Sequence, residues 1–210
     1  MIQITIDDRA LELEEKITVL QAARKLGIKI LTLCYNDKLS AYGGCRICLV
    51  EVQIGKDAAR SRLLPACCSD VEDGLVIKTN SERVKRARVF IIEMLLSRCP
   101  ESEEIQGIAR ELGVSPGEPG ASPAERESLD VVGEYLLYRA PKLDETKCIV
   151  CGLCVRVCAE ITERHSLSFS ERGMKRKVKT PFEKISTTCI GCGSCAYVCP
   201  TNTIAVEEVT

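Results

Sequence analysis

The chain has 210 residues and a formal net charge of −1 at pH 7, so it lacks the basic excess typical of nucleic-acid-binding proteins. It contains 14 cysteines, and residues 1–8 have the pattern of a strand rather than that of a signal peptide. Cysteines at metal-ligand spacing without an export signal indicate the reducing cytosol. The longest apolar run, residues 89–96, is interrupted by Glu93 and is far shorter than the ~18 residues that span a bilayer. We therefore expect a cytoplasmic protein that neither binds nucleic acid nor inserts directly into a membrane.

The first predicted elements are a β-hairpin and a helix. Apolar residues alternate over residues 2–6 and again over residues 11–14, with a turn at residues 7–9. Thr18 is placed to cap a helix over residues 19–26, and Gly27 is placed to end it. Two strands with a helix laid across them are the opening of a β-grasp fold.

Cysteines downstream of this helix fit a [2Fe-2S] centre. The plant-type pattern is C-x4-C-x2-C with a distant fourth cysteine. The cysteines that fit it here are Cys34, Cys45, Cys48 and one of the adjacent pair Cys67 and Cys68. The first gap has ten residues, which only lengthens the loop over the cluster at small entropic cost. Spacing alone leaves the fourth ligand open between the two adjacent cysteines.

The surroundings of these cysteines favour a cluster loop. Gly43 and Gly44 allow the tight turn that a loop over a buried cofactor needs. Residues 49–52 and 75–79 read as strands that leave and close the site. The alternative is that the cysteines are buried as ordinary apolar residues, which is common for free cysteine.

The middle of the chain is predicted to be helical. Ser81 is placed to cap an amphipathic helix that runs to residue 97, and a second helix over residues 101–112 is closed by Gly113. Residues 115–123 are a turn-rich linker, and the apolar residues 135–138 are expected to pack against the last domain. The predicted domains are a [2Fe-2S] β-grasp domain at residues 1–80, a helical segment with the Pro/Gly-rich linker at 81–138, and a ferredoxin-like dicluster domain at 139–210. The predicted fold class is α+β.

The last domain contains the run C-x2-C-x2-C-x3-C twice, and Pro200 follows the second run. This is the pattern of bacterial ferredoxins with two [4Fe-4S] clusters, in which the fourth cysteine of each run binds the other run's cluster. The first cluster is predicted to be bound by Cys148, Cys151, Cys154 and Cys199, and the second by Cys189, Cys192, Cys195 and Cys158. Structural zinc is the alternative, but its sites usually take two pairs of ligands and fit two four-cysteine runs poorly.

An insert at residues 159–188 separates the two runs. It reads as a β-hairpin with strands over residues 166–170 and 174–179. The basic face of the hairpin either docks an acidic electron carrier or is simply solvated. The only histidine, His165, is expected on the surface rather than at a metal.

Taken together, these motifs resemble a known family. The chain is similar to the small diaphorase subunit of NAD-linked hydrogenases (HoxU type) and to the N-terminal part of the large iron–sulfur subunit of complex I (NuoG type). The matching stretches are residues 42–52 (YGGCRICLVEV), 65–67 (PAC), 80–84 (NSERV), 151–158 (CGLCVRVC), 172–173 (RG), 189–195 (CIGCGSC) and 199–201 (CPT). The resemblance implies one [2Fe-2S] and two [4Fe-4S] clusters, and it implies Cys67 rather than Cys68 as the fourth [2Fe-2S] ligand.

One region departs from this family. The family usually carries an additional [4Fe-4S] cluster, bound by one histidine and three cysteines, just after the long helix. Residues 96–103 (LSRCPESE) contain Cys99 alone and no histidine. We therefore expect this cluster to be absent, with Cys99 as a structural remnant.

The resemblance implies a function in electron transfer. We expect an iron–sulfur subunit of a cytosolic, multi-subunit, NAD(P)-linked and flavin-containing oxidoreductase, of the hydrogenase, formate dehydrogenase or electron-bifurcating type. Its partners would be a flavoprotein NAD(P)-binding subunit and a catalytic subunit, with soluble ferredoxin as another acceptor. The sequence offers no catalytic residues and no G-x-G-x-x-G nucleotide motif.

Two other functions fit parts of the pattern. The iron–sulfur subunit of a succinate dehydrogenase or fumarate reductase joins the same two domain types, but its first cysteine gap is normally short. The second alternative is a redox sensor or scaffold protein in which the clusters are structural. Twelve well-spaced ligands are more than that role needs.

Overall fold

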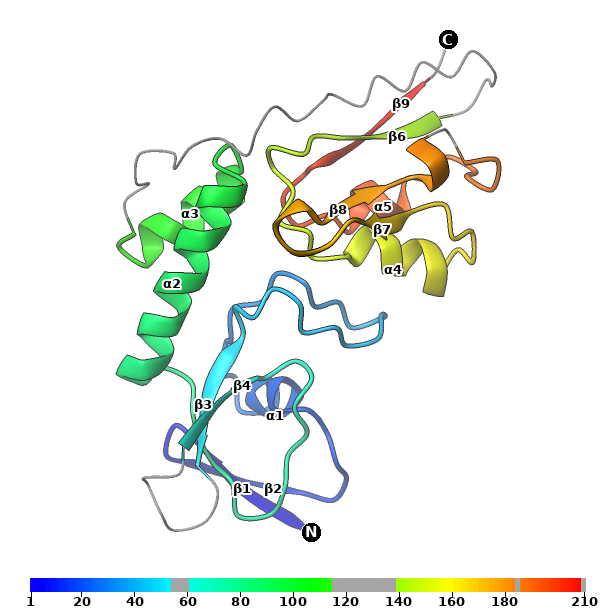
Figure 1. Cartoon of the computed structure of the whole chain (residues 1–210). Helices are drawn as coiled ribbons and strands as arrows, with labels where there is room; N and C mark the ends of the chain where they lie inside the picture. The colour runs from blue at the N-terminus through cyan, green and yellow to red at the C-terminus, as the bar shows by residue number, and fades with distance from the viewer. Residues whose placement is uncertain (54–60, 115–138, 184–185, 209–210) are drawn as a thin grey trace. The chain divides into compact units, whose positions relative to one another are not determined.

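The computed structural model describes residues 1–53, 61–114, 139–183 and 186–208. The chain falls into two compact units, Met1–Tyr35 with Ala41–Ile92 and Asn36–Ser40 with Glu93–Thr210. Figure 1 shows the helices and strands of both units. The predicted linker at residues 115–123 and the apolar residues 135–138 lie outside the described residues.

The first unit is built on a five-stranded sheet in the order β2-β1-β5-β3-β4. β1 pairs antiparallel with β2 and parallel with β5, and β3 pairs antiparallel with both β5 and β4. The strands are β1 (Ile2–Ile6), β2 (Arg9–Leu13), β3 (Leu49–Gln53), β4 (Ser61–Pro65) and β5 (Val76–Lys78). The predicted hairpin and both predicted later strands are confirmed, whereas β4 is a strand that the sequence pattern did not predict.

Helix α1 (Val19–Lys25) covers this sheet and completes the β-grasp arrangement. Its N-terminus is fixed by a capping box, in which Thr18 Oγ1 accepts a hydrogen bond from the Gln21 N–H and Gln21 Oε1 accepts one from the Thr18 N–H. Leu20 packs in one core with Ile6 and Ile77 of the sheet, and all three are at most 1% exposed. Burying side chains of this size stabilises the fold by about 1.5–3 kcal/mol each.

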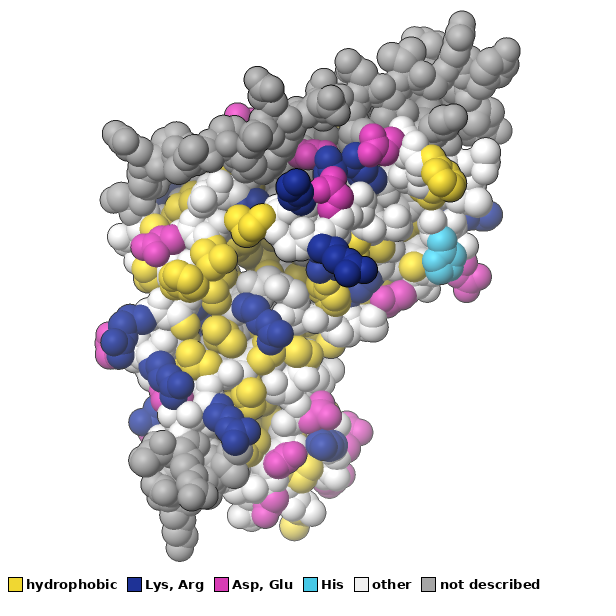
Figure 2. Space-filling model, in the orientation of Figure 1, with side chains coloured by type: hydrophobic (Ala, Val, Ile, Leu, Met, Phe, Trp, Pro, Cys, Tyr) yellow, Lys and Arg dark blue, Asp and Glu magenta, His cyan; other side chains and the backbone are white. Residues whose placement is uncertain are grey.

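Helices α2 (Glu82–Arg98) and α3 (Glu103–Glu111) follow. As predicted, Ser81 caps α2, because its Oγ accepts a hydrogen bond from the Val84 N–H at 3.3 Å. Ser102 caps α3 in the same way through the Ile105 N–H at 3.4 Å. Lys and Arg side chains lie beside hydrophobic ones on the visible face of α2 (Figure 2). No helix in the described ranges is both long and apolar enough to cross a membrane.

Around the second set of cysteines, the second unit has two small antiparallel sheets and the helices α4 and α5. The elements are β6 (Arg139–Leu143) paired with β9 (Ile204–Glu208), β7 (Ser168–Ser170) paired with β8 (Lys177–Lys179), α4 (Leu153–Glu160) and α5 (Ser194–Tyr197). Short 3-10 turns lie at Gly173–Lys175 and Pro181–Glu183. The predicted insert hairpin is thus present, with shorter strands than expected. A small core of Cys154, Leu167, Val178 and Ile204 joins α4, the hairpin and β9.

Candidate iron–sulfur sites

The structure brings together four cysteines of the first unit. Cys34, Cys48 and Cys67 are each 1% exposed, and Cys45 is half-buried. The Cys45 N–H donates to Cys34 Sγ at 3.5 Å. The thiols of Cys34 and Cys45 also hydrogen-bond to each other, as do those of Cys48 and Cys67. Three different loop segments therefore supply one compact group of sulfurs.

Hydrogen bonds between these thiols, together with burial, shift the pKa values of Cys45, Cys48 and Cys67. The hydrogen bond from the Cys67 thiol lowers the pKa of Cys48 to about 7, and the same bond, together with burial, raises the pKa of Cys67. The hydrogen bond with Cys34, together with burial, raises the pKa of Cys45. Four neighbouring sulfurs, three of them buried, cannot all become thiolates unless a cation lies among them. The ferric ions of a [2Fe-2S] cluster supply such a charge, so the donor set fits the cluster.

Cys68 differs from these four cysteines in its exposure. It is exposed, and its thiol lies 3.9 Å from the Pro65 carbonyl oxygen. A Cβ on Gly43 would come within 2.7 Å of Cys68 Sγ, so this thiol packs directly against the backbone of Gly43. Gly43 has φ +62°, which a side chain would strain as well. Of the two adjacent cysteines, Cys67 is therefore buried in the core and Cys68 lies at the surface.

The second unit contains two cysteine-lined pockets. The first, called here the Cys148 pocket, is lined by Cys148, Cys151, Cys154 and Cys199, with residues from the following loops and β9. The Val150 N–H donates to Cys148 Sγ at 3.4 Å, and the Thr203 N–H donates to Cys199 Sγ at 3.3 Å. Burial raises the pKa of Cys148 and of Cys154.

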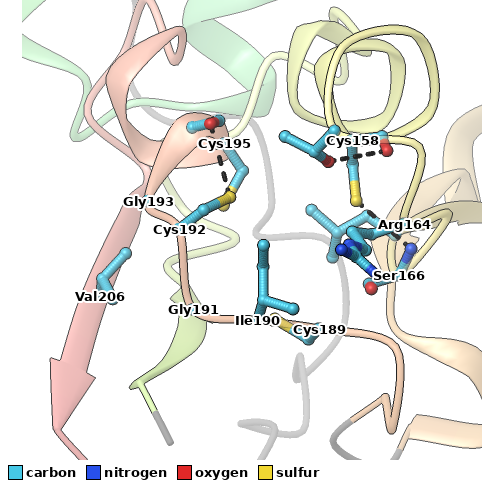
Figure 3. A pocket seen from close by; sticks show the side chains of 13 residues that line it. Cys158, Arg164, Ser166, Cys189, Ile190, Gly191, Cys192, Gly193, Cys195 and Val206 are labelled. Carbon is cyan, nitrogen blue, oxygen red and sulfur yellow. Dashed lines mark hydrogen bonds between the residues drawn. The ribbon is translucent and has the colours of Figure 1, made fainter.

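The other pocket, called here the Cys158 pocket, is lined by Cys158, Cys189, Cys192 and Cys195 (Figure 3). The Ser166 N–H donates to Cys158 Sγ at 3.3 Å. A hydrogen bond between Cys192 Sγ and Ser194 Oγ at 3.4 Å lowers the pKa of Cys192, whereas burial raises the pKa of Cys195 to about 11. Cys192 is the exposed cysteine of this set.

The local fold explains how each run of four cysteines is divided between the pockets. Cys154 and Cys158 lie four residues apart on α4 and line different pockets. Cys199 follows α5 and lines the pocket of the first run. A glycine with positive φ stands before each helix, Gly152 at +76° and Gly193 at +74°, and lets the backbone turn there.

Backbone N–H groups in the two pockets also suit the binding of iron–sulfur clusters. In both pockets N–H groups point at cysteine sulfurs, and hydrogen bonds of this kind favour the thiolate form that binds iron. Within the ranges that the structure covers, no three His, Cys, Asp or Glu side chains converge to hold a single metal ion. The cysteines of the two runs line two separate pockets, four in each.

Other predicted residues lie outside these sites. His165 is exposed, and its backbone N–H donates to the Cys158 carbonyl oxygen. Cys99 is fully buried, and its thiol donates to the Leu95 carbonyl oxygen at 2.8 Å. The basic hairpin face has partners within the chain, since Arg176 stacks on the Phe169 ring at 3.7 Å. Lys177 and Lys179 form ion pairs with Glu171 and Glu183.

Comparison with known proteins agrees with this description. The family described as "2Fe-2S iron-sulfur cluster binding domain" matches residues 1–82, and the family described as "4Fe-4S dicluster domain" matches residues 147–205. An NADH-quinone oxidoreductase subunit of Rhizobium meliloti is 35% identical over 211 residues, covering 95% of this chain. The chain contains both of these domain types, consistent with a HoxU/NuoG-type iron–sulfur subunit. As such it carries one [2Fe-2S] and two [4Fe-4S] clusters.

Two further proteins resemble this chain along its length. NADP-reducing hydrogenase subunit HndD of Solidesulfovibrio fructosivorans is 34% identical over 232 residues, which is 99% of this chain. A crystal structure of an NAD+-reducing [NiFe]-hydrogenase in the H2-reduced state has a chain that superposes with a TM-score of 0.78 at 24% identity. That match covers 98% of this chain and 87% of the other, and it shows the same fold. The chain spans only 23% and 36% of the length of the Rhizobium and Solidesulfovibrio proteins.

Proposed function

We propose that this chain is the electron-transfer subunit of a cytosolic, flavin-containing, NAD(P)-linked oxidoreductase complex. The observation that carries the proposal is the grouping of twelve cysteines into three cluster-sized sets within matched [2Fe-2S] and dicluster domains. Single-electron transfer is the chemistry that these clusters supply when bound. Relatives named as NADH-quinone oxidoreductase and NADP-reducing hydrogenase subunits support the NAD(P) link.

The proposed ligands follow the grouping of the sulfurs. We assign Cys34, Cys45, Cys48 and Cys67 to the [2Fe-2S] cluster, Cys148, Cys151, Cys154 and Cys199 to one [4Fe-4S] cluster, and Cys189, Cys192, Cys195 and Cys158 to the other. Backbone N–H groups donate to the sulfurs of Cys148, Cys158 and Cys199, and such donors orient these side chains within the two pockets. The buried surroundings of Cys34, Cys48 and Cys67 keep water from the iron.

The proposed partners are a flavoprotein that binds NAD(P) and a catalytic subunit, with ferredoxin as an alternative acceptor. The relatives are themselves named as subunits, which supports a multi-subunit complex. In this scheme the flavoprotein exchanges a hydride with the nucleotide and passes single electrons to this chain. This chain itself supplies the cysteine ligands, the buried surroundings of the clusters and the backbone N–H groups that donate to the sulfurs.

The test combines metal analysis with reconstitution. The full chain, purified anaerobically, should contain about ten iron atoms with matching acid-labile sulfide. Its clusters should be reduced by NADH or NADPH only after a diaphorase flavoprotein is added. Reduction by the nucleotide without any flavoprotein would refute the subunit role, and stoichiometric zinc with little iron would refute electron transfer altogether.

A further inference from the structure

Arg88 is a cation inside the first unit that neither the ligand sets nor the proposed electron route uses. It lies within α2, and one of its terminal nitrogens, Nη2, donates to the carbonyl oxygens of Leu49 and Thr79, each at 3.0 Å. Leu49 is the first residue of β3 and directly follows the ligand Cys48. The guanidinium is thereby fixed against the backbone at the exit of the cluster loop.

The contacts of Arg88 differ from those of a structural salt bridge. Its Nε is buried and has no hydrogen-bond partner among the described residues, so the guanidinium is incompletely satisfied. Burial lowers the pKa of Arg88, while the negative charges of Cys48 and Asp7 raise it. Asp7 itself accepts hydrogen bonds from the Thr79 N–H and hydroxyl at 2.8 and 2.5 Å. Burying a cation in this way costs free energy, and a neighbouring negative charge offsets that cost.

We infer that Arg88 is a positioning and tuning residue that raises the reduction potential of the [2Fe-2S] cluster through its fixed charge beside Cys48. This inference rests on the ligand set proposed above. Four thiolates and two sulfides leave the cluster net negative, and one-electron reduction makes it more negative while no bond is formed or broken. A fixed cation therefore stabilises the reduced form more than the oxidised form, since local charge is one determinant of cluster potential.

The neighbouring Arg86 provides a matched control. It lies on the same helix but is exposed, and its Nε donates to the Glu82 carbonyl oxygen of its own helix at 3.4 Å. Charges at the surface are screened by water and salt far more than partly buried ones. Replacing Arg86 removes the same charge without touching the cluster loop.

The experiment is a redox titration of the full chain monitored by EPR, with dithionite as the electron donor. Arg88→Gln removes the charge and keeps an amide donor, whereas Arg88→Lys keeps the charge and loses the planar fork. We expect Arg88→Gln to make reduction of the [2Fe-2S] cluster about tenfold less favourable, which is ~59 mV for one electron. Arg88→Lys and Arg86→Gln should match the unchanged protein, and the [4Fe-4S] potentials should not move.

The results separate three cases. An unchanged potential in Arg88→Gln, or an equal shift in Arg88→Lys, overturns the inference and leaves Arg88 as a purely structural tie. If Arg88→Gln does not retain the [2Fe-2S] signal, Arg88→Lys decides, because a retained signal at unchanged potential supports the charge effect and a shifted potential rejects it. Absence of a [2Fe-2S] signal in the unchanged chain would instead refute the proposed ligand set.

Discussion

The ring of Phe169 lies directly over Gly152, so close that a Cβ carbon on the glycine would come within 2.6 Å of Phe169 Cζ. Gly152 stands between Cys151 and α4 and has φ +76°. Phe169 belongs to the insert hairpin and carries Arg176 stacked on its ring. The hairpin therefore covers the loop of the first cysteine run, and this loop requires glycine for both its backbone angle and its close contact.

Gly152→Ala should destabilise the second unit more than Gly193→Ala. Both glycines have nearly the same positive φ, and a side chain in that conformation costs about 1–2 kcal/mol. At Gly193 the nearest atom to an added Cβ is Val206 Cγ2 at 3.9 Å, so no clash is added. At Gly152 the clash with Phe169 adds about 1–3 kcal/mol. Thermal unfolding and iron content measure the difference, and Phe169→Leu should partly rescue Gly152→Ala. Equal losses in the two alanine variants would contradict the role of Phe169.

Glu51 should make the stability of the first unit depend on acid pH. Its carboxylate accepts hydrogen bonds from Ser61 Oγ at 2.6 Å and Ser81 Oγ at 2.5 Å, and Arg83 lies 3.7 Å away. These contacts, led by the two hydroxyl bonds, lower the pKa of Glu51 from 4.5. A carboxyl group whose pKa is lower in the folded protein than in the unfolded chain stabilises the fold fully at pH values above its unfolded-state pKa. This stabilisation is lost as the pH falls through its folded-state pKa.

Glu51→Gln should therefore lower the free energy of unfolding by about 1–2 kcal/mol at pH 7 and reduce its decline below pH 4.5. Urea unfolding between pH 3 and pH 7 measures both effects. Glu82→Gln is the control, because Glu82 is 79% exposed and forms a surface ion pair with Lys85 of its own helix. A pH profile for Glu51→Gln that parallels the original would rule out this contribution.

Cys67 and Cys68 should respond oppositely to replacement by serine. Cys67→Ser removes a buried sulfur that bonds to the Cys48 thiol, and it should abolish or strongly alter the [2Fe-2S] EPR signal. Cys68→Ser changes an exposed thiol and should leave signal and iron content unchanged. The reverse pattern would assign the fourth ligand to Cys68.

Cys99→Ala should leave the iron content at about ten atoms per chain. The Cys99 thiol donates to the Leu95 carbonyl oxygen within α2, which is a structural contact, and losing it should cost about 1 kcal/mol of stability. Iron analysis and thermal unfolding of the same sample separate the two effects. About fourteen iron atoms in the unchanged chain, falling to about ten in Cys99→Ala, would reveal a further cluster that uses Cys99.

Local signals in the sequence predicted most of the fold. The caps at Thr18 and Ser81, the hairpin turn after β1 and the glycines before α4 and α5 all depend on residues a few positions apart, and so they are readable from sequence. The spacing of the cysteine runs likewise predicted which sulfurs line each pocket of the second unit.

Other features depend on neighbours that are distant in sequence. Strand β4 has no clear alternation and ends at Pro65, and it pairs because β3 offers a partner edge, with Val50 opposite Leu64. In the sequence, Arg88 is one of four basic residues between positions 83 and 88, and nothing local distinguishes it from the others. Its actual acceptors are carbonyl oxygens of Leu49, 39 residues away, and Thr79, nine residues away. No local pattern encodes such a contact.

The position of β5 has a consequence for biosynthesis. β5 lies between β1 and β3 in the sheet, yet it is the last of the five strands to leave the ribosome. All the proposed [2Fe-2S] ligands precede it, so the nascent chain exposes these cysteines while its two hairpins are still unjoined. Closure of a contact about seventy residues apart, between Thr5 and Val76, is entropically slow. Pairing of β5 with both β1 and β3 is therefore the step that joins the two hairpins on either side of the cysteine loop.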